Sequence, residues 1–434
     1  MDTEIGPLGY SLVKDKIPSH FLENIRNELY VKPIENPNFP TNEKEYPVFR
    51  MSKSKIYLPR YYGITKYSQP KKNVLVDGET INVTFNGLLR DIQETTIDAI
   101  LKNYEEYGGG LVSLATGLGK TVVALKLISL IKRKTLIIVH AEFLLEQWVE
   151  RIKTFLPDAR IGIIQQDKCQ YQDCDIVVGM LQSIVKREYP KECFKSMGHM
   201  IVDECHHLGS KTFSSIFFKI QTKYMLGLSA TPDRKDGLSK VIYWFLGPQI
   251  VDIKRETNKP SIVFINSNIT VDEKFNKLGK INNPSMISDL TLNGERNDLI
   301  LKTICEYNKK SRKILVLSDR RQHCEYILKN LIDLGISAGN YLGGMKTLDR
   351  NNSTNCSVII GTYQASGEGF DVPDLDTLIL ASPKSNVEQA VGRILRQKNL
   401  NDPIVIDIVD NFSIFKGQYY KRKKFYKIEN YKIL

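Results

Sequence analysis

The chain has no apolar run that approaches the roughly 20 residues of a membrane-spanning helix. Its acidic start, Met1-Asp-Thr-Glu, is unlike a secretory signal peptide, so we expect neither a membrane segment nor export. The seven cysteines are scattered, odd in number, and spaced in no standard zinc-ligand pattern. This cysteine usage argues against a disulfide framework and favours an intracellular, reducing compartment.

Length and patterning predict more than one α/β domain. At 434 residues, 42% of them hydrophobic, the chain can form two or three soluble domains with separate cores. Short β-branched runs alternate with amphipathic stretches from Gly110 onward, and this alternation restarts after Asn297. The predicted strands are 111–115, 135–139, 161–164, 175–178, 199–202, 224–228, 314–317, 358–360, 377–380 and 404–408, and the predicted helices are 121–131, 143–155, 319–334 and 387–395. Such alternation is typical of the α/β class, with parallel sheets covered by helices.

The segments outside this pattern divide the chain into five predicted parts. Many Pro, Asn and Tyr residues and little periodicity mark 1–80 as a small accessory region. A polar stretch with few signals, 254–296, is predicted to be a hinge between the two α/β domains. The predicted parts are therefore an N-terminal accessory region (1–80), a first α/β domain (81–253), the hinge (254–296), a second α/β domain (297–411) and a basic, aromatic tail (412–434).

Positive charge gathers in two short tracts. The formal net charge is +12, and residues 48–72 hold seven basic side chains with no acidic one. Residues 412–434 hold seven more, against one acidic side chain. Four tyrosines accompany each tract: Tyr57, Tyr61, Tyr62 and Tyr67 in the first, and Tyr419, Tyr420, Tyr426 and Tyr431 in the second. Charge localised in this way is more telling than the same charge spread over the whole chain.

Both tracts have the composition of a nucleic-acid surface. Cations contact phosphates without reading the bases, and aromatic faces stack on unpaired bases. In the tail this interpretation assigns nucleic-acid contacts to Lys421, Arg422, Lys423 and Lys424. Deleting the tail would then weaken binding and flatten its salt dependence. A solubilising surface, or a nuclear-import signal at 421–424, remains the alternative.

The segment Leu114-Ala-Thr-Gly-Leu-Gly-Lys-Thr121 predicts a phosphate-binding loop, because it lies between a predicted strand and a predicted helix. Glycines let backbone N–H groups curl around phosphate oxygens, and the helix N-terminus favours negative charge. The predicted ATP-binding residues are Thr116, Gly117, Leu118, Gly119, Lys120 and Thr121. Lys120 would bridge the β- and γ-phosphates, and the Thr121 hydroxyl would bind Mg²⁺. Leu114 departs from the general pattern, which has glycine there.

Asp203 and Glu204 follow the apolar run Met200-Ile-Val202, at the end of a predicted parallel strand. Ligands bind at that end of such sheets. Asp203 is suited to holding Mg²⁺ through water, and Glu204 to deprotonating the attacking water. We expect the adjacent His206 and His207 to couple this site to neighbouring motifs rather than to chelate a metal. The alternative is an acidic pair that caps the following helix.

The second α/β domain carries motifs of its own. Thr362 begins a segment whose turn, Gly367-Glu-Gly-Phe-Asp371, is suited to contacting a phosphate backbone and a ribose, which includes Gly369 and Asp371 in the predicted site. Further on, Gln389, Arg393 and Arg396 lie three or four residues apart and would share one helix face. Guanidinium groups on that face could stabilise charge on a γ-phosphate, as an arginine finger does. An amphipathic helix with a solvated basic side is the alternative.

These motifs together, with Ser229-Ala-Thr-Pro232, resemble the motif set of superfamily 2 helicases and translocases. The resemblance covers about 88 to 410 and implies two tandem RecA-like domains that use ATP and Mg²⁺. It also implies that Gln93 reads adenine with Arg90 as its support. The segments Phe143-Leu-Leu-Glu-Gln-Trp148 and Gly179-Met-Leu-Gln-Ser183 look like nucleic-acid contacts, which assigns Gln182 and Ser183 to the strand.

A narrower resemblance is to the XPB-like DNA translocases, a phage recombination helicase and the poxvirus transcript-release helicases with their relatives in large DNA viruses. The segments that carry it are 53–63, 226–237 and 420–426, and the Asp-Glu-Cys-His form at 203–206 departs from the RNA-remodelling group. Lys235 stands where XPB-like proteins carry an acidic residue.

The narrower resemblance implies an ATP-dependent helicase or translocase that acts on DNA rather than RNA in viral transcription termination. RNA polymerase would be a partner, and a virion or cytoplasmic viral factory would be the location. An RNA-directed DExH helicase, or a nucleic-acid-binding scaffold with a vestigial ATPase, is the alternative.

Overall fold

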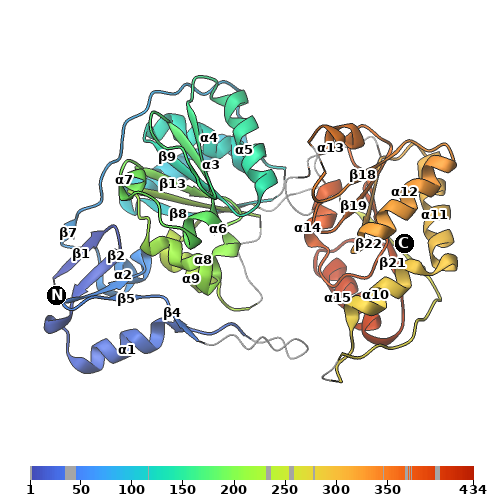
Figure 1. Ribbon diagram of the computed structural model, residues 1–434, viewed down its shortest axis with the longest axis horizontal. Coiled ribbons are helices and arrows are strands. Elements are labelled where there is room, and N and C mark those ends of the chain that lie inside the picture. Colours follow the sequence, from blue (N-terminus) through green and yellow to red (C-terminus); the bar gives the residue numbers. More distant parts are fainter. Residues whose placement is uncertain are drawn as a thin grey trace. The chain divides into compact units, whose positions relative to one another are not determined.

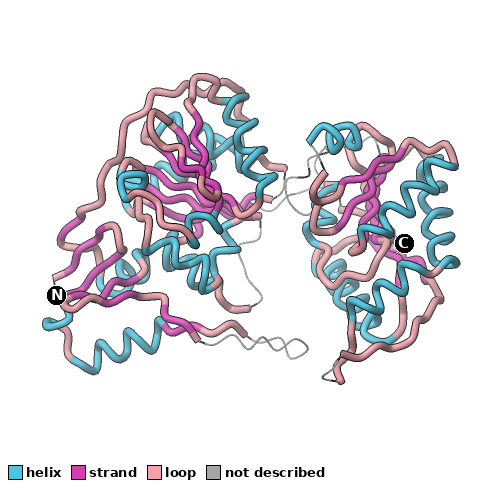
Figure 2. Tube along the Cα trace, viewed as in Figure 1, coloured by secondary structure: helices cyan, strands magenta, loops and turns pink. Residues whose placement is uncertain are grey.

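The computed structural model separates the chain into two compact units. It describes residues 2–34, 45–115, 117–230, 236–253, 259–276, 279–345, 347–366, 370, 372, 374–395 and 401–434. Unit 1 comprises Met1–Lys254, and unit 2 comprises Arg255–Leu434. Each unit has its own layers of strands and helices (Figure 1; Figure 2).

The start of unit 1, which the sequence predicted to be a small accessory region, is a folded module. Its sheet has the strand order β5-β6-β2-β1-β7, and β3 and β4 form a separate antiparallel pair. The elements of this N-terminal module are β1 (Thr3–Gly6), β2 (Gly9–Val13), the 3-10 helix η1 (Lys14–Lys16), α1 (Ser19–Leu29), β3 (Tyr30–Val31), β4 (Tyr46–Pro47), β5 (Arg50–Met51), β6 (Lys55–Leu58), α2 (Arg60–Tyr67) and β7 (Lys72–Asn73). Its core residues, Leu12 and Ile56 among them, belong to the same hydrophobic cluster as Phe245 further along unit 1. The module is therefore continuous with the rest of the unit.

The larger sheet of unit 1 has eight strands in the order β11-β10-β12-β9-β13-β14-β8-β15. All of its pairs are parallel except β10 with β11. Its elements are α3 (Asp91–Glu106), β8 (Gly109–Leu114), α4 (Lys120–Ile131), β9 (Thr135–Val139), α5 (Glu142–Phe155), β10 (Ile161–Gln165), β11 (Lys168–Cys169), β12 (Ile176–Met180), α6 (Leu181–Lys186), α7 (Lys191–Lys195), β13 (His199–Val202), η2 (Cys205–Gly209), α8 (Lys211–Ser214), η3 (Ser215–Phe218), β14 (Tyr224–Ser229), α9 (Ser239–Leu246) and β15 (Gln249–Ile253).

Both faces of this sheet are buried, because alternate side chains of each strand enter different cores. On β9, Leu136 and Ile138 pack with α6, α9 and the N-terminal module. Ile137 and Val139 pack on the opposite face with α3, α4 and α5. Burial on both faces explains the continuous β-branched runs that made these strands predictable.

Unit 2 is built on a seven-stranded sheet in the order β18-β19-β17-β20-β21-β16-β22, with every pair parallel. Its elements are β16 (Ser261–Asn266), α10 (Asn283–Leu292), α11 (Gly294–Lys309), β17 (Ile314–Ser318), α12 (Arg321–Asp333), β18 (Ala338–Tyr341), α13 (Thr347–Thr354), β19 (Val358–Thr362), β20 (Thr377–Leu380), α14 (Glu388–Val391), η4 (Gly392–Ile394), β21 (Ile404–Val409), α15 (Ser413–Ile428) and β22 (Lys432–Ile433). Residues of α11 and α12 share one core, and residues of α14 and α15 share the other. The two α/β units agree with the predicted fold class.

Two of the predicted segments are wrong in their structural assignment. Most of the hinge, 254–296, belongs to unit 2, because β16 pairs with β21 and β22, and α10 packs against Phe415. The segment 412–434 is a packed element rather than a tail, since α15 buries Phe415, Arg422 and Tyr426. In both cases the partner that buries the segment lies far away in sequence. No helix in the described ranges is long and apolar enough to cross a membrane.

Candidate functional site

The turn between β8 and α4 has the backbone that a phosphate group needs. Gly117 and Gly119 adopt φ angles of 83° and 88°, in the region that disfavours side chains with a Cβ. Helix α4 begins at Lys120, and no side chain from the described residues caps its N-terminus. Its first backbone N–H groups are therefore available to an anion. The Lys120 ammonium donates to the Leu114 carbonyl oxygen at 3.3 Å, and Thr116 lies outside the described residues.

Gln93 and Arg90 brace this loop from the start of α3. The buried Gln93 side chain donates to the Leu118 carbonyl at 3.0 Å and accepts from the Arg90 backbone N–H at 3.0 Å. The Arg90 guanidinium donates to the Gly117 carbonyl at 3.4 Å. A Cβ at Gly119 would lie 2.2 Å from Gln93 Nε2, so the loop fits closely against this side chain. The two residues implied to recognise adenine thus also support the phosphate loop.

The acidic pair at the end of β13 is held in a fixed arrangement. Asp203 Oδ2 accepts from the Trp148 indole N–H at 2.8 Å, and Asp203 Oδ1 accepts from the Glu204 backbone N–H at 3.0 Å. Burial, and then the charge of Glu204, raise the pKa of Asp203 to about 6, against the opposing effects of Trp148 and Lys120. A cation beside these carboxylates would favour the ionised form of both.

Glu204 has an unusual backbone, with φ of 45°. For a residue other than glycine this left-handed conformation is strained, and such strain concentrates at functional sites. His206 lies 3.3 Å from Glu204 Oε2 and 3.2 Å from Ser229 Oγ. His206 therefore contacts both the acidic pair and the end of β14, and the coupling of the histidines to a neighbouring motif stays a prediction.

The residues of this part of unit 1 fit Mg-ATP. A glycine turn, an uncapped helix start and Lys120 suit the triphosphate, whereas Thr121 and Asp203 provide the oxygen ligands that Mg²⁺ prefers. Thr121 is half-buried at the first turn of α4. Apart from Thr116, the residues that the sequence predicted for the triphosphate and Mg²⁺ in unit 1 lie at the ends of β8 and β13 and the start of α4, at the carboxyl edge of one parallel sheet, and Arg90 and Gln93 lie at the start of α3.

The predicted strand-contacting residues have backbone partners. Gln182 Nε2 donates to the His140 carbonyl at 2.6 Å, and Ser183 Oγ accepts from the Gln166 backbone N–H at 2.9 Å. In unit 2, Thr362 Oγ1 accepts from the Ala365 N–H at 3.2 Å. These contacts shape the loops in which the residues lie, and their nucleic-acid role stays a prediction.

In unit 2, Arg393 is 5% exposed and donates to the Phe370 carbonyl at 2.6 Å. The predicted helix over 387–395 is shorter than expected, because α14 gives way to the 3-10 helix η4 at Gly392. Gly369, Asp371 and Arg396 lie outside the described residues. Their roles at the nucleotide, and that of Arg393, stay predictions.

Comparisons with known proteins agree with this geometry. Residues 86–234 match the family described as type III restriction enzyme, res subunit, and residues 295–398 match the helicase conserved C-terminal domain. A protein of Acanthamoeba polyphaga mimivirus, provisionally named an ATP-dependent RNA helicase, is 34% identical over 448 residues, which cover 99% of this chain and 86% of that protein. The chain belongs to the superfamily 2 helicases.

A second viral relative agrees with this membership. A provisionally named helicase of Invertebrate iridescent virus 6 is 31% identical over 388 residues, covering 81% of this chain and 85% of that protein. The crystal structure of T4 UvsW aligns over 100% of this helicase and 99% of its own chain, with a TM-score of 0.42 and 19% identity. The relatives place the helicase among the superfamily 2 enzymes of large DNA viruses, which confirms the predicted family and ATP-hydrolysing class. Families of this kind use ATP and bind nucleic acid.

One basic residue of the predicted nucleic-acid surface is wrongly assigned. Arg422 is 2% exposed, and its guanidinium pairs with both oxygens of Asp407, at 2.8 Å and 2.7 Å. It has no face left for a phosphate. Lys421 and Lys424 are exposed on α15, and Lys423 is half-buried with its ammonium 5.6 Å from the centre of the Tyr419 ring. The prediction therefore stands only for the three lysines.

Several tyrosines in the two tracts are core residues rather than stacking platforms. Tyr61 and Tyr62 are buried and donate to the Tyr107 carbonyl and the Glu28 carboxylate. Tyr426 is buried and donates to Asp407. Arg60 is also buried, and it donates to the carbonyls of Thr222, Lys223 and Tyr107. These side chains attach elements to one another instead of facing a strand.

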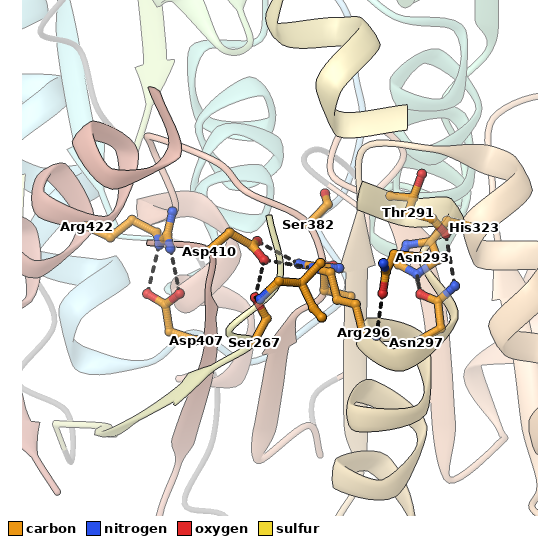
Figure 3. Close-up of polar contacts among 12 residues, drawn as sticks. Ser267, Thr291, Asn293, Arg296, Asn297, His323, Ser382, Asp407, Asp410 and Arg422 are labelled. Carbon is orange, nitrogen blue, oxygen red and sulfur yellow. Dashed lines mark hydrogen bonds and ion pairs between the residues drawn. The ribbon is translucent and has the colours of Figure 1, made fainter. Parts of the chain in front are cut away.

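Figure 3 shows a second buried ion pair in unit 2, close to that of Arg422 with Asp407. The fully buried Arg296 donates to both Asp410 oxygens at 2.9 Å and to the Ala381 carbonyl at 2.8 Å. Arg422 also donates to the Lys384 carbonyl at 2.7 Å. Both arginines therefore fix 381–384, the segment that leads from β20 to α14 and Arg393.

Proposed function

We propose that this helicase is a translocase that moves along DNA and acts in viral transcription termination or transcript release. The observation that carries the DNA assignment is the segment Lys53–Gly63, one of the three segments on which the narrower resemblance to XPB-like translocases rests. This segment forms β6 and α2, whose Arg60 is bonded to carbonyls of the nucleotide-binding unit. A module attached so firmly would move with the ATPase unit, as a DNA-contacting module of a translocase must.

Residues of unit 1 carry most of the proposed ATPase chemistry. Lys120 and the α4 N-terminus would hold the triphosphate, and Asp203 with Thr121 would hold Mg²⁺, which neutralises charge on the phosphates when it is bound. Glu204 accepts the proton of the attacking water. His206 contacts both Glu204 and Ser229, and so couples the catalytic carboxylate to the motif at the end of β14. We further propose that Arg393 and Arg396 stabilise γ-phosphate charge, and that RNA polymerase is a partner of the enzyme in a cytoplasmic viral factory or virion.

The second candidate is an RNA-directed helicase, which the names of two relatives favour. The mimivirus relative and one from African swine fever virus are both provisionally named ATP-dependent RNA helicases. Phosphate contacts alone serve either nucleic acid.

Matched strands separate the two candidates. We expect DNA oligonucleotides to stimulate ATP hydrolysis, measured as phosphate release, at least about 10-fold more than RNA of the same sequence. The salt concentration is the same in both assays, because salt sets the phosphate contribution to affinity. Lys120→Ala provides the hydrolysis-negative control. Stimulation by RNA alone would replace the DNA assignment with the RNA one. Strand separation, assayed on a duplex with a single-stranded end, then distinguishes unwinding from translocation.

The exposed lysines of α15 give a second test. Replacing Lys421 and Lys424 with Ala removes up to two phosphate contacts. The negative slope of log K for nucleic-acid binding against log salt should therefore become shallower, by about 1.4 to 1.8. The matched control is Lys302→Ala with Lys329→Ala, because these lysines are exposed on α11 and α12, away from α15. Equal slopes in both double variants would assign α15 to another partner. Deleting 412–434 is not suitable, since it would remove buried Phe415, Arg422 and Tyr426.

A further inference from the structure

One buried side chain connects helix α5 directly to the acidic pair. Trp148 is 1% exposed, and its indole N–H donates to Asp203 Oδ2 at 2.8 Å, across 55 residues of sequence. Because Asp203 Oδ1 accepts the Glu204 N–H, each oxygen of this carboxylate has a donor. A carboxylate held on both oxygens keeps one orientation, and its remaining lone pairs then have fixed directions.

The indole does more than fill space. Its N–H is one of the two donors that hold the Asp203 carboxylate. A donor that acts on an anion in a dry site makes a stronger hydrogen bond than one between neutral groups. Any movement of Trp148 therefore changes the direction of the carboxylate that is suited to Mg²⁺.

The other end of this connection lies at the segment that resembles a nucleic-acid contact. Trp148 is the last residue of Phe143–Trp148, on the second turn of α5. His140, just before α5, accepts through its carbonyl from Gln182 of the second such segment at 2.6 Å. This hydrogen bond thus joins the second segment to the residue just before α5, and α5 connects that position to Asp203 through Trp148.

We propose that Trp148 is a positioning residue through which a bound strand sets the orientation of Asp203. The proposal rests on the nucleic-acid-dependent ATPase activity proposed above. Strand binding at the two segments locks α5, so Trp148 stays against Asp203 and the carboxylate keeps the orientation that its two donors give it. Hydrolysis then depends on the strand because an unanchored Asp203 holds the metal poorly.

The first experiment uses fluorescence and needs no turnover. The chain has two tryptophans, and the other, Trp244 on α9, packs against Tyr62 at 5.4 Å between ring centres. In a Trp244→Phe protein the only indole is Trp148. We expect Mg-ADP, and separately a DNA strand without nucleotide, to change its emission. Adding Asp203→Asn to this background should abolish the Mg-ADP response. An emission insensitive to Mg-ADP, or a response that survives Asp203→Asn, would overturn the proposal.

The second experiment removes the N–H while keeping an aromatic ring. Trp148→Phe should lower the strand-stimulated kcat about 10-fold, the loss expected for one hydrogen bond to a charged group, and raise the Mg²⁺ concentration for half-maximal rate. KM for ATP at saturating Mg²⁺ should change less than about twofold, because uniform binding of the nucleotide is untouched. Ile152→Val is the matched control, since Ile152 lies one turn later on α5 and is 0% exposed.

The control separates positioning from packing. Ile152→Val opens a small space in the same core without removing a polar contact, so its kcat and Mg²⁺ response should match the wild type. Equal losses in both variants would mean that Trp148 acts only by packing. If Trp148→Phe fails to fold, the fluorescence experiment still decides, because it leaves Trp148 in place. A wild-type ATPase indifferent to every nucleic acid would refute the proposed function, whereas the Mg-ADP response would still test the contact between Trp148 and Asp203.

Discussion

Glu204→Gln is expected to lower strand-stimulated ATP hydrolysis by roughly 10²- to 10⁴-fold, the range for losing a positioned general base. The amide keeps the shape of the side chain but cannot accept a proton from water. ATP binding should persist, because Lys120 and the loop at 117–119 are untouched. Phosphate release measures the first effect, and calorimetric titration with ATP measures the second.

The matched control for this variant is Glu150→Gln, an exposed glutamate on α5. It makes the same chemical change away from β13 and should leave both measurements unaltered. Hydrolysis at the wild-type rate in Glu204→Gln would show that the catalytic assignment is wrong, and would favour a scaffold whose ATPase is vestigial. Because Gln and Glu have the same backbone preferences, the strain at φ of 45° is the same in both proteins.

The parts of the fold that the sequence predicted well are those whose burial is local. The strands β9, β13 and β20 have the predicted bounds, because each is a short, largely apolar run whose residues are all buried. The phosphate loop and the acidic pair could also be predicted from the sequence. Their glycines, lysine and carboxylates occupy fixed positions directly after a strand. Their chemistry needs only that local context.

The remainder depends on partners that sequence spacing does not reveal. Counting charge treated Arg60 and Arg422 as surface cations, yet each is buried against acceptors from other elements. Trp148 was visible only as part of a motif, because its partner Asp203 is 55 residues away. The signal in the sequence that could have singled out Trp148 was its place as the aromatic residue that ends the segment Phe143–Trp148. The N-terminal region was predicted as a small accessory region but its elements were not, for a similar reason, since the residues of short strands such as β6 share a core with the rest of unit 1.

Arg296→Met is expected to lower the free energy of unfolding of unit 2 by about 3–5 kcal/mol, the cost of leaving one partner of a buried ion pair uncompensated. Both residues of the pair have side chains that are 0% exposed, so Asp410 would keep its charge without water or a cation. Ser267 still donates to Asp410 at 2.7 Å, but one hydroxyl cannot replace a guanidinium. Urea unfolding of the full chain, followed through the transition of unit 2, measures the loss.

The matched control for Arg296→Met is Lys313→Met, which breaks a pair with Asp374 at the same 2.9 Å distance but at the surface, where the aspartate is 63% exposed. We expect it to cost less than about 1 kcal/mol, as exposed pairs do. Arg296→Met with Asp410→Leu should recover part of the stability, because no buried charge is then left alone. Equal costs for the two single variants would mean that burial does not set the value of the Arg296 pair. Because Arg296 also holds the Ala381 carbonyl, the loss should reach the segment before α14 and lower ATPase activity well below the unfolding midpoint.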